Sequence, residues 1–281
     1  MQLHVIETGL FKLDGGAMFG VVPKSIWHKT NPADENNMCT WAMRCLLVED
    51  GNKLILIDTG IGNKQSEKFF SHYYLHGDAS LESSLKQCGF STSDITDVIL
   101  THLHFDHCGG AITKGGDGVL RPSFPNAHYW SNDRHWQWAT VPNAREKASF
   151  LEENIMPIKE SGQLRMIERC ADDSGTGLNM DFIFVDGHTD SMMLPVISWR
   201  GRKICFMADL LPSVGHIPMA YVMGYDTRPL ITLDEKAKIL RRAVDENWVL
   251  FFEHDSLHEC ATLQNTEKGI RAGEFFLLKE L

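Results

Sequence analysis

The sequence predicts an α/β fold, a four-layer αβ/βα sandwich in which two mixed sheets pack face to face with helices outside. Three observations predict it. Several expected strands are almost wholly apolar, which is typical of sheets covered on both faces. Helical stretches separate these strands, and the second half of the chain repeats the order of the first. No linker divides the 281 residues, so we predict a single domain over residues 1–281.

The first half of the chain opens its regular structure with an expected hairpin. An apolar run at 53–58 stops at Thr59-Gly60, and a turn at 49–52 joins it to another apolar run at 41–48. The other elements expected here are a helical stretch over 65–89 broken near Gly77-Asp78, strands at 98–100 and 127–130, and a long helical stretch from about 132 to 159.

In the second half, several expected strands end in or beside a histidine or an aspartate. The expected elements are strands at 181–185, 193–199 and 203–209, an amphipathic helix over 233–246, a strand at 248–252 and a last helix over 266–279. Residues 10–40, with their Gly, Pro and Asn residues, are interpreted as a lid over the site or as a dimer contact.

Charge and hydropathy restrict the partners of the protein. The net charge is −10 and there is no basic stripe, which disfavours nucleic acid as a partner. No run approaches the roughly 20 apolar residues that span a bilayer, and no export signal is recognised, so we expect a cytoplasmic location and no membrane partner. The seven cysteines are scattered without a Cys-x-x-Cys motif, which predicts reduced thiols.

Candidate ligands for metal ions crowd into one segment directly after the expected strand 98–100: His102-Leu103-His104-Phe105-Asp106-His107. Imidazoles and carboxylates bind zinc and similar divalent ions. Four such groups within six residues are not expected to bind one tetrahedral ion together. Alternate residues of an extended loop point the same way, so His102 and His104 predict one metal, and Asp106 with His107 a second. Gly109-Gly110 lets the backbone turn tightly beside them.

This segment resembles the His-x-His-x-Asp-His signature of the metallo-β-lactamase superfamily. Asp58-Thr59-Gly60 resembles the family's Asp-Thr-Gly strand end, and Gly187-His188-Thr189 resembles its third ligand block. The resemblance covers roughly residues 40 to 260 and implies the metallo-β-lactamase fold. It implies two divalent ions, zinc foremost, with manganese, iron or cobalt as alternatives. The implied ligands are His102, His104 and His188 for the first metal, Asp106, His107 and His254 for the second, and Asp209 as the bridge.

Asp58 is expected to act behind the ligands. A carboxylate at a buried strand end is costly unless paired, and this one can accept a hydrogen bond from a ligand histidine and fix its tautomer. A cap of the Asp-Thr-Gly turn is the alternative. Asp190 and Asp255 are further candidates for such a role, with a plain surface charge as the alternative, and His258 competes with His254 as a ligand.

Two metal ions imply hydrolysis. A water that bridges two cations becomes hydroxide near neutral pH and attacks a carbonyl or phosphoryl centre, with Asp106 and Asp209 as the catalytic carboxylates. Cys108 is not needed as a nucleophile; tight packing explains its position, and an altered ligand set is the alternative. We therefore expect a dinuclear metallo-hydrolase that opens a lactone or cleaves a related ester, with a phosphotriesterase-like enzyme or another metallo-hydrolase as the alternative.

The substrate expectation comes from the lactonase and phosphotriesterase branch of the family. A ligand set that contains both Asp106 and a bridging Asp209 resembles that of this branch. That branch includes N-acyl-homoserine lactone hydrolases and methyl-parathion-hydrolase-like proteins. Some homoserine lactonases place a tyrosine three residues after the bridging aspartate, where this sequence has Pro212. The candidates to assist the lactone carbonyl instead are Tyr221, Tyr225 and His216.

A di-iron redox protein is disfavoured, because the di-iron branch of the family has a glutamate at the position of His104. The expected partner is a small-molecule substrate, with a homodimer left open. Candidates for an apolar pocket wall are Met18, Phe19, Trp27, Phe105, Met219 and Met223, with the protein core as the alternative.

Overall fold

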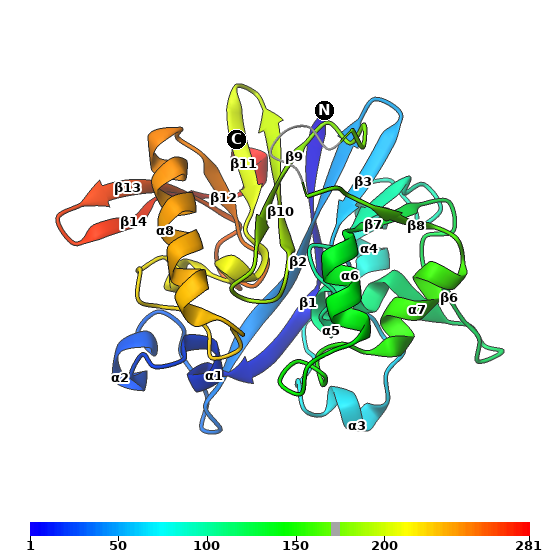
Figure 1. The fold of residues 1–281 in the computed structure, drawn as a ribbon, viewed down its shortest axis with the longest axis horizontal. Helices are drawn as coiled ribbons and strands as arrows, with labels where there is room; N and C mark the ends of the chain where they lie inside the picture. Colours follow the sequence, from blue (N-terminus) through cyan, green and yellow to red (C-terminus); the bar gives the residue numbers. More distant parts are fainter. Residues whose placement is uncertain (170–174) are drawn as a thin grey trace. The chain divides into compact units, whose positions relative to one another are not determined.

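The computed structural model describes residues 1–169 and 175–281, so the predicted thiol of Cys170 lies outside the described residues. The chain divides into two compact units (Figure 1). Unit 1 comprises Met1–Gly9 and Met43–Asn179, and unit 2 comprises Leu10–Ala42 and Met180–Leu281. The described residues form two six-stranded sheets of mixed direction with helices, which confirms the predicted α/β class.

The first sheet positions the His-rich motif. In spatial order it contains β1 (Gln2–Asp14), β2 (Met38–Asp50), β3 (Lys53–Ile57), β4 (Asp97–Ile99), β7 (His128–Ser131) and β8 (Leu164–Met166). β2 and β3 form the expected antiparallel hairpin, whereas β3, β4, β7 and β8 run parallel. Because parallel strands end at the same edge of a sheet, Asp58 after β3 and His102 after β4 share one edge.

The second sheet belongs wholly to unit 2. In spatial order it contains β14 (Gly269–Phe276), β13 (Cys260–Thr266), β12 (Val249–Phe251), β11 (Arg202–Phe206), β10 (Met192–Trp199) and β9 (Asp181–Val185). β11 and β12 are parallel, and the other pairs are antiparallel. β9, β11 and β12 therefore run in the same direction, which places His188, Asp209 and His254 at one edge of this sheet.

Most helices are short, and α8 (Pro229–Asp245) is the longest of the described helices. It packs against β13 in unit 2 (Figure 1). Ser80 and Ser83 form a reciprocal cap at the start of α4 (Leu81–Gln87), and Asn132 caps α6 (Asp133–Thr140). The other helices are α1 (Gly15–Phe19), α2 (Lys24–Trp27), α3 (Glu67–Phe70), α4 (Leu81–Gln87), α5 (Phe105–Cys108), α6 (Asp133–Thr140) and α7 (Glu152–Glu160); β5 (Ile112–Lys114) and β6 (Leu120–Pro122) form a separate hairpin.

Two sequence predictions of helix are wrong. The segment 266–279 contains the last residue of β13, a two-residue turn and β14, because Gly269 adopts a φ of 86° after the turn and the pairing extends the sheet beyond β12. The stretch 132–159 is interrupted between α6 and α7, where Pro142 and Asn143 break the pattern. α8 begins at Pro229, earlier than expected, since proline fits the first turn of a helix.

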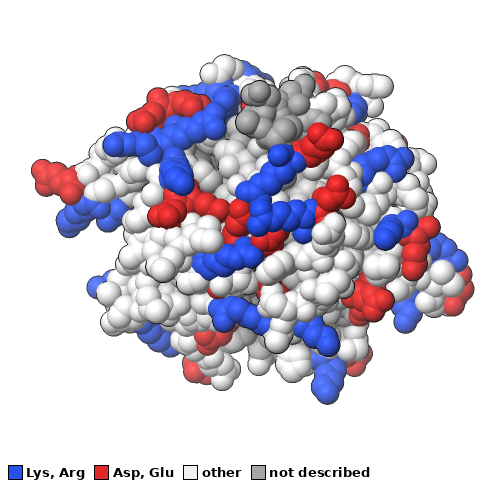
Figure 2. All heavy atoms as spheres, viewed as in Figure 1, with Lys and Arg blue, Asp and Glu red and all other residues white. Residues whose placement is uncertain are grey.

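None of the helices within residues 1–169 and 175–281 combines the length and apolar character needed to cross a bilayer. On the face that Figure 2 displays, the Lys and Arg side chains of the described residues are interspersed with Asp and Glu side chains.

Candidate metal centre

The His-rich motif of unit 1 lies in a tight loop around α5. His104 is the residue before this helix, and Gly109 and Gly110 follow it. A Cβ atom added to Gly109 would lie 2.1 Å from the carbonyl oxygen of Ile61, and one added to Gly110 would lie 2.2 Å from that of Thr59. Only glycine allows this approach, so the two glycines pack the loop directly against the segment that follows Asp58.

Two imidazoles of the motif are held through their Nδ1 atoms. His107 Nδ1 lies 3.1 Å from Asp58 Oδ2, and His102 Nδ1 lies 3.1 Å from Thr101 Oγ1. Thr101 donates its hydroxyl and its backbone N–H to Asp58, at 2.6 and 2.8 Å. The structure thus confirms that Asp58 contacts a candidate ligand histidine. With Nδ1 occupied in this way, Nε2 is the atom that would bind a metal.

Asp58 holds this position with an unusual backbone. Its φ is 58°, in the left-handed region that non-glycine residues seldom adopt. Such strain persists where surrounding contacts enforce it, and it concentrates at functional sites. Three donors on the Asp58 carboxylate provide those contacts, so the residue is more than a cap of the Asp-Thr-Gly turn.

His104 and Asp106 complete the group in unit 1. His104 Nε2 lies 3.6 Å from Oε1 of Glu146, whose carboxylate is buried. Asp106 Oδ2 lies 3.8 Å from His107 Nε2. Potential ligand atoms of His102 and His104 lie within 4.8 Å of each other. The four candidate ligands of this motif are therefore buried and close together within unit 1.

The three later candidates form one group in unit 2. The two oxygens of Asp209 lie 3.1 Å from His188 Nε2 and 3.1 Å from His254 Nε2. His188 Nδ1 lies 3.0 Å from Asp226 Oδ1, and His254 Nδ1 donates to the carbonyl oxygen of Ala42 at 2.7 Å. Both imidazoles are thus anchored through Nδ1 and turn Nε2 toward the carboxylate of Asp209.

The electrostatics of this group favour a cation. Burial alone would lower the pKa of His188, but the carboxylates of Asp209 and Asp226 outweigh it and raise the pKa to about 10. A divalent ion supplies positive charge at the same place and competes with the proton for the imidazole. Imidazole nitrogens and carboxylate oxygens are also the donor types that suit zinc and related ions, so the side chains of both groups fit a metal.

His258 does not match His254 as a candidate ligand. Its Nδ1 atom lies 3.3 Å from Asp255, its ring lies 4.4 Å from that of Phe275, and its side chain is partly exposed. Asp255 also accepts backbone N–H groups of its own loop, at Leu257 and His258. The contacts of His258 and Asp255 are those of a structured turn, whereas His254 is buried against Asp209.

Asp190, the other candidate for a supporting role, forms an ion pair with Arg228 at 2.8 Å. The same arginine donates to the carbonyl oxygen of Asp186 at 2.6 Å. These contacts tie the segment around His188 to the start of α8. Asp190 is 4% exposed, so it is not the plain surface charge of the alternative interpretation.

His216 is a core residue of unit 2. Its Nδ1 contacts Ser213 Oγ at 2.9 Å, its Nε2 donates to the Met18 carbonyl at 2.8 Å, and Phe19 stacks on its ring at 4.4 Å. Burial lowers its pKa to about 4. His216 is therefore fixed as a neutral packing residue.

Five of the six candidates for the apolar pocket wall are buried, and Met219 is 39% exposed. The buried ones are Met18, Phe19, Trp27, Phe105 and Met223.

Cys108 is fully buried beside the motif. Its Sγ donates to the carbonyl oxygen of Leu103 at 3.3 Å. Burial raises the pKa of the thiol to about 12. The side chain therefore remains a thiol that packs the loop, as expected from the sequence.

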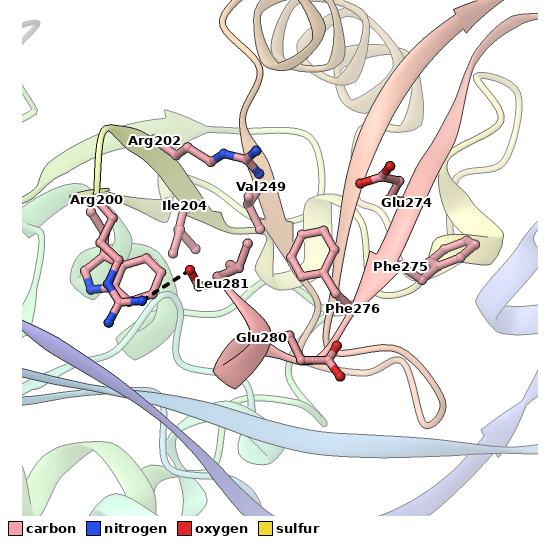
Figure 3. Close-up of a pocket in the computed structure, with 10 residues that line it drawn as sticks. Arg200, Arg202, Ile204, Val249, Glu274, Phe275, Phe276, Glu280 and Leu281 are labelled. Atoms are coloured by element: carbon pink, nitrogen blue, oxygen red, sulfur yellow. Dashed lines mark hydrogen bonds between the residues drawn. The ribbon is translucent and has the colours of Figure 1, made fainter.

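A separate cavity of about 520 Å³ lies in unit 2, lined by residues of β11, β12, β14 and the last residues of the chain (Figure 3). Arg200 donates to the carbonyl oxygen of Leu281 at its rim, at 3.2 Å. Arg202, Glu274 and Phe276 also line it. None of the candidate metal ligands is among its lining residues, so we place the chemistry of the chain at the strand ends instead.

Sequence reasoning missed several residues that support the ligands. Glu146 lies in a stretch interpreted as a polar helix, and no role behind a ligand was assigned to Asp226. Thr101 and His135 were also missed; His135 Nε2 accepts the backbone N–H of Leu103 at 2.9 Å, inside the ligand loop. No spacing rule identifies such residues, because each depends on a long-range contact; only the position of Thr101, directly before the motif, offered a signal.

The strand-end residues and the two mixed sheets are those of an α/β protein with side chains that could hold metal ions, and comparison with known proteins identifies the family. Residues 44–254 match the family described as the metallo-beta-lactamase superfamily. The chain therefore belongs to the metallo-β-lactamase superfamily and has its fold.

Individual relatives are similar over part of the sequence. An N-acyl homoserine lactonase of Bacillus cereus is 30% identical over 168 residues, which cover 56% of this chain and 62% of that protein. A probable metallo-hydrolase of Mycobacterium bovis is 33% identical over 114 residues, covering 37% of this chain and 34% of the relative. The match thus spans about a third to three fifths of the length of these two relatives.

Solved structures are similar over nearly the whole chain. A probable metal-dependent hydrolase from Staphylococcus aureus has a TM-score of 0.88 and 26% identity, with 100% of this chain and 98% of that chain covered. The dizinc quorum-quenching lactonase AidC, in complex with its product, has a TM-score of 0.77 and 23% identity, covering 98% and 95%. At 23% identity, the similarity to AidC shows a shared fold.

Proposed function

We propose that the chain is a metal-dependent hydrolase that binds two divalent metal ions. His102, His104 and His188 would hold one ion, Asp106, His107 and His254 the other, and Asp209 would bridge them. The observation that carries the proposal is the anchoring of imidazoles within each unit: Asp58 and Thr101 in unit 1, and Asp226 and Ala42 in unit 2, accept from Nδ1. All seven candidate ligands also fall in groups of buried side chains that could hold a metal.

The side chains of the chain itself prepare the reaction. When bound, two divalent cations acidify a water molecule and polarise the oxygen of the bond to be cleaved. The two oxygens of Asp209 lie 3.1 Å from the imidazoles of His188 and His254, and these two rings orient the carboxylate. Asp106 is buried at the start of α5, where its negative charge adds to the affinity for cations. Both carboxylates therefore act by placing charge at the reacting centre.

We propose lactones, or related carboxylic esters, as the substrate class. The support is the identity to the Bacillus cereus lactonase together with the ligand set that includes Asp106 and Asp209. Pro212 lacks a hydroxyl, and its carbonyl oxygen accepts the backbone N–H of His254 at 3.2 Å. A hydroxyl that assists the lactone carbonyl must therefore come from another residue.

Tyr73 of unit 1 has the properties of such a donor. Its ring lies 4.7 Å from that of Phe105, the neighbour of Asp106. Burial, with a contribution from the charge of Asp106, raises its pKa to about 12. The phenol therefore keeps its proton at neutral pH and can donate a hydrogen bond to a carbonyl oxygen.

Metal analysis combined with a substrate panel tests the proposal. Purified protein supplied with zinc, manganese or cobalt is assayed on lactones, aryl esters and phosphotriesters, alongside His104→Ala. The exposed His72 provides a matched control in His72→Ala. We expect metal to bind, lactones to be the best substrates, and only His104→Ala to abolish turnover. Failure to bind metal, or full activity of His104→Ala, contradicts the proposal; preference for phosphotriesters would move the substrate class to the alternative.

A further inference from the structure

Glu146 of unit 1 is a buried carboxylate that the proposed ligand set leaves without a role. Its side chain is 4% exposed. An ionised carboxylate in such surroundings is costly unless donors surround it. Oε2 accepts hydrogen bonds from Trp138 Nε1 at 2.7 Å and from Asn143 Nδ2 at 2.5 Å. Oε1 lies 3.6 Å from His104 Nε2, so the carboxylate joins a fixed pair of donors to a candidate ligand.

The segment that carries Glu146 packs directly on the ligand loop. The backbone N–H of Phe105 donates to the carbonyl oxygen of Ser149 at 3.0 Å, and the ring of Phe150 lies 4.7 Å from that of His104. Ser149 in turn donates its backbone N–H to the carbonyl oxygen of Glu146 at 2.8 Å. The position of Glu146 relative to His104 is thus set by several contacts within unit 1.

His104 differs in one respect from the other four candidate ligand histidines. Each of those imidazoles has its contact with Thr101, Asp58, Asp226 or Ala42 at Nδ1, whereas the carboxylate of Glu146 faces Nε2 of His104. A neutral imidazole has one N–H and one lone pair, and a nearby carboxylate favours the N–H on its own side. The lone pair of His104 then lies on Nδ1.

We propose that Glu146 is a positioning residue that keeps the proton of His104 on Nε2 and makes Nδ1 its metal-binding atom. This inference rests on the proposed function, because it concerns a ligand of the proposed centre. Glu146 orients the ligand through its negative charge, which lies 3.6 Å from Nε2, in the way that carboxylates behind metal-binding histidines do. With Glu146 included, all five candidate ligand histidines have a partner behind the ring. The partner of His104 faces Nε2, whereas the partners of the other four contact Nδ1.

Glu146→Gln separates this role from packing, because the amide has nearly the shape of the carboxylate. The amide oxygen must stay opposite the donors of Trp138 and Asn143, so the NH₂ group turns toward His104. That group can only donate, and it therefore favours the tautomer with the proton on Nδ1, which cannot bind metal. We expect metal affinity to fall about 10- to 100-fold.

Two controls accompany this variant. Glu160→Gln makes the same chemical change at an exposed site at the end of α7 and should leave metal affinity unchanged. Trp138→Phe removes one donor from Oε2 but leaves Oε1 opposite His104, so it should keep the wild-type tautomer even if it lowers stability.

The readouts are chelator competition with Zn²⁺ or Co²⁺ and ¹⁵N NMR of the His104 ring in metal-free protein. We expect Nε2 to carry the proton in the wild type and in Trp138→Phe, and Nδ1 to carry it in Glu146→Gln. A wild-type proton on Nδ1, or undiminished metal affinity in Glu146→Gln, would overturn the inference. If the wild type binds no metal, the proposed function fails, yet the ring spectrum still decides whether Glu146 sets the tautomer.

Discussion

The ligand groups of the two units reach similar chemistry by different routes. In unit 1, four candidate ligands come from one loop after β4, and a long-range carboxylate, Asp58, organises it. In unit 2, the three candidates follow three separate strands, and Asp209 itself contacts both imidazoles. The first group depends on a local motif, whereas the second depends on the sheet that brings β9, β11 and β12 to one edge.

This difference predicts where each group is vulnerable. A substitution in unit 1 acts on one loop with several anchors, so damage can spread from one ligand to the next. A substitution in unit 2 acts on a ligand whose neighbours are held by other strands, so its effect stays with the charge that was removed. Comparing equivalent substitutions in the two units therefore shows whether local or long-range contacts dominate.

The largest effect is expected for Asp209→Asn. The change removes the negative charge that lies 3.1 Å from two imidazoles and keeps the side-chain shape. We expect kcat/KM for a lactone to fall about 1,000-fold, which corresponds to about 4 kcal/mol of transition-state stabilisation. Asp245→Asn, an exposed change at the end of α8, is the control and should have wild-type kinetics. A loss of less than tenfold in Asp209→Asn would remove this residue from the centre.

The next effect compares the two carboxylates behind the histidines, Asp58→Asn and Asp226→Asn. Each substitution should lower metal affinity about 10- to 100-fold in a chelator titration. Asp58→Asn should also lower the melting temperature of metal-free protein more than Asp226→Asn does, because both oxygens of Asp58 accept hydrogen bonds from Thr101 and an amide offers only one oxygen. If Asp58→Asn melted at the wild-type temperature, the loop of unit 1 would not depend on Asp58.

The same comparison explains what the sequence could predict. His102 to His107 are recognisable because chemistry and position coincide in six residues. His188, Asp209 and His254 were predictable through their order at strand ends and the family resemblance. Glu146 and Asp226 were not, because a carboxylate distant in sequence becomes a partner of an imidazole only through folding.

The errors in the fold have a related cause. The segment over 266–279 has residues that suit a helix, but its pairing with the edge of the second sheet decides its structure. Propensity describes a segment alone, whereas a strand gains its hydrogen bonds from a neighbour. The apolar runs of β3 and β12 were predictable, since burial on both faces leaves a mark in the sequence itself.

Two lysines that donate to backbone carbonyl oxygens allow a smaller comparison of the two units. Lys64 in unit 1 donates to the carbonyl oxygen of Gly109, and Lys236 in unit 2 donates to those of Pro218, Met219 and Tyr221. Replacing Lys236 by Met should lower the free energy of unfolding by about 2 kcal/mol, and the same change at Lys64 by about 1 kcal/mol, because fewer carbonyls lose a donor. Denaturant titrations measure both; a larger loss at Lys64 would contradict the comparison.

The pH dependence of stability tests Lys236 further. Burial lowers its pKa from 10.5 to about 7, so the unfolded chain binds more protons than the folded chain between these values. The free energy of unfolding should therefore gain a contribution that rises with pH over this window. Lys236→Met removes that contribution, so its curve for metal-free protein should be flatter than that of the wild type. Parallel curves would show that Lys236 does not titrate in this range.

The smallest effect is expected for Cys108→Ala. This thiol follows His107 in the sequence, and a nucleophilic role for it would set the two units apart in mechanism. Burial raises the pKa of Cys108 to about 12, so little thiolate forms at neutral pH. We expect kcat/KM to stay at the wild-type value, a stability loss of about 1 kcal/mol from the lost packing, and no reaction of Cys108 with iodoacetamide in the folded protein. A lost turnover in a folded, metal-loaded Cys108→Ala would make the thiol part of the reaction and would break the likeness between the two groups.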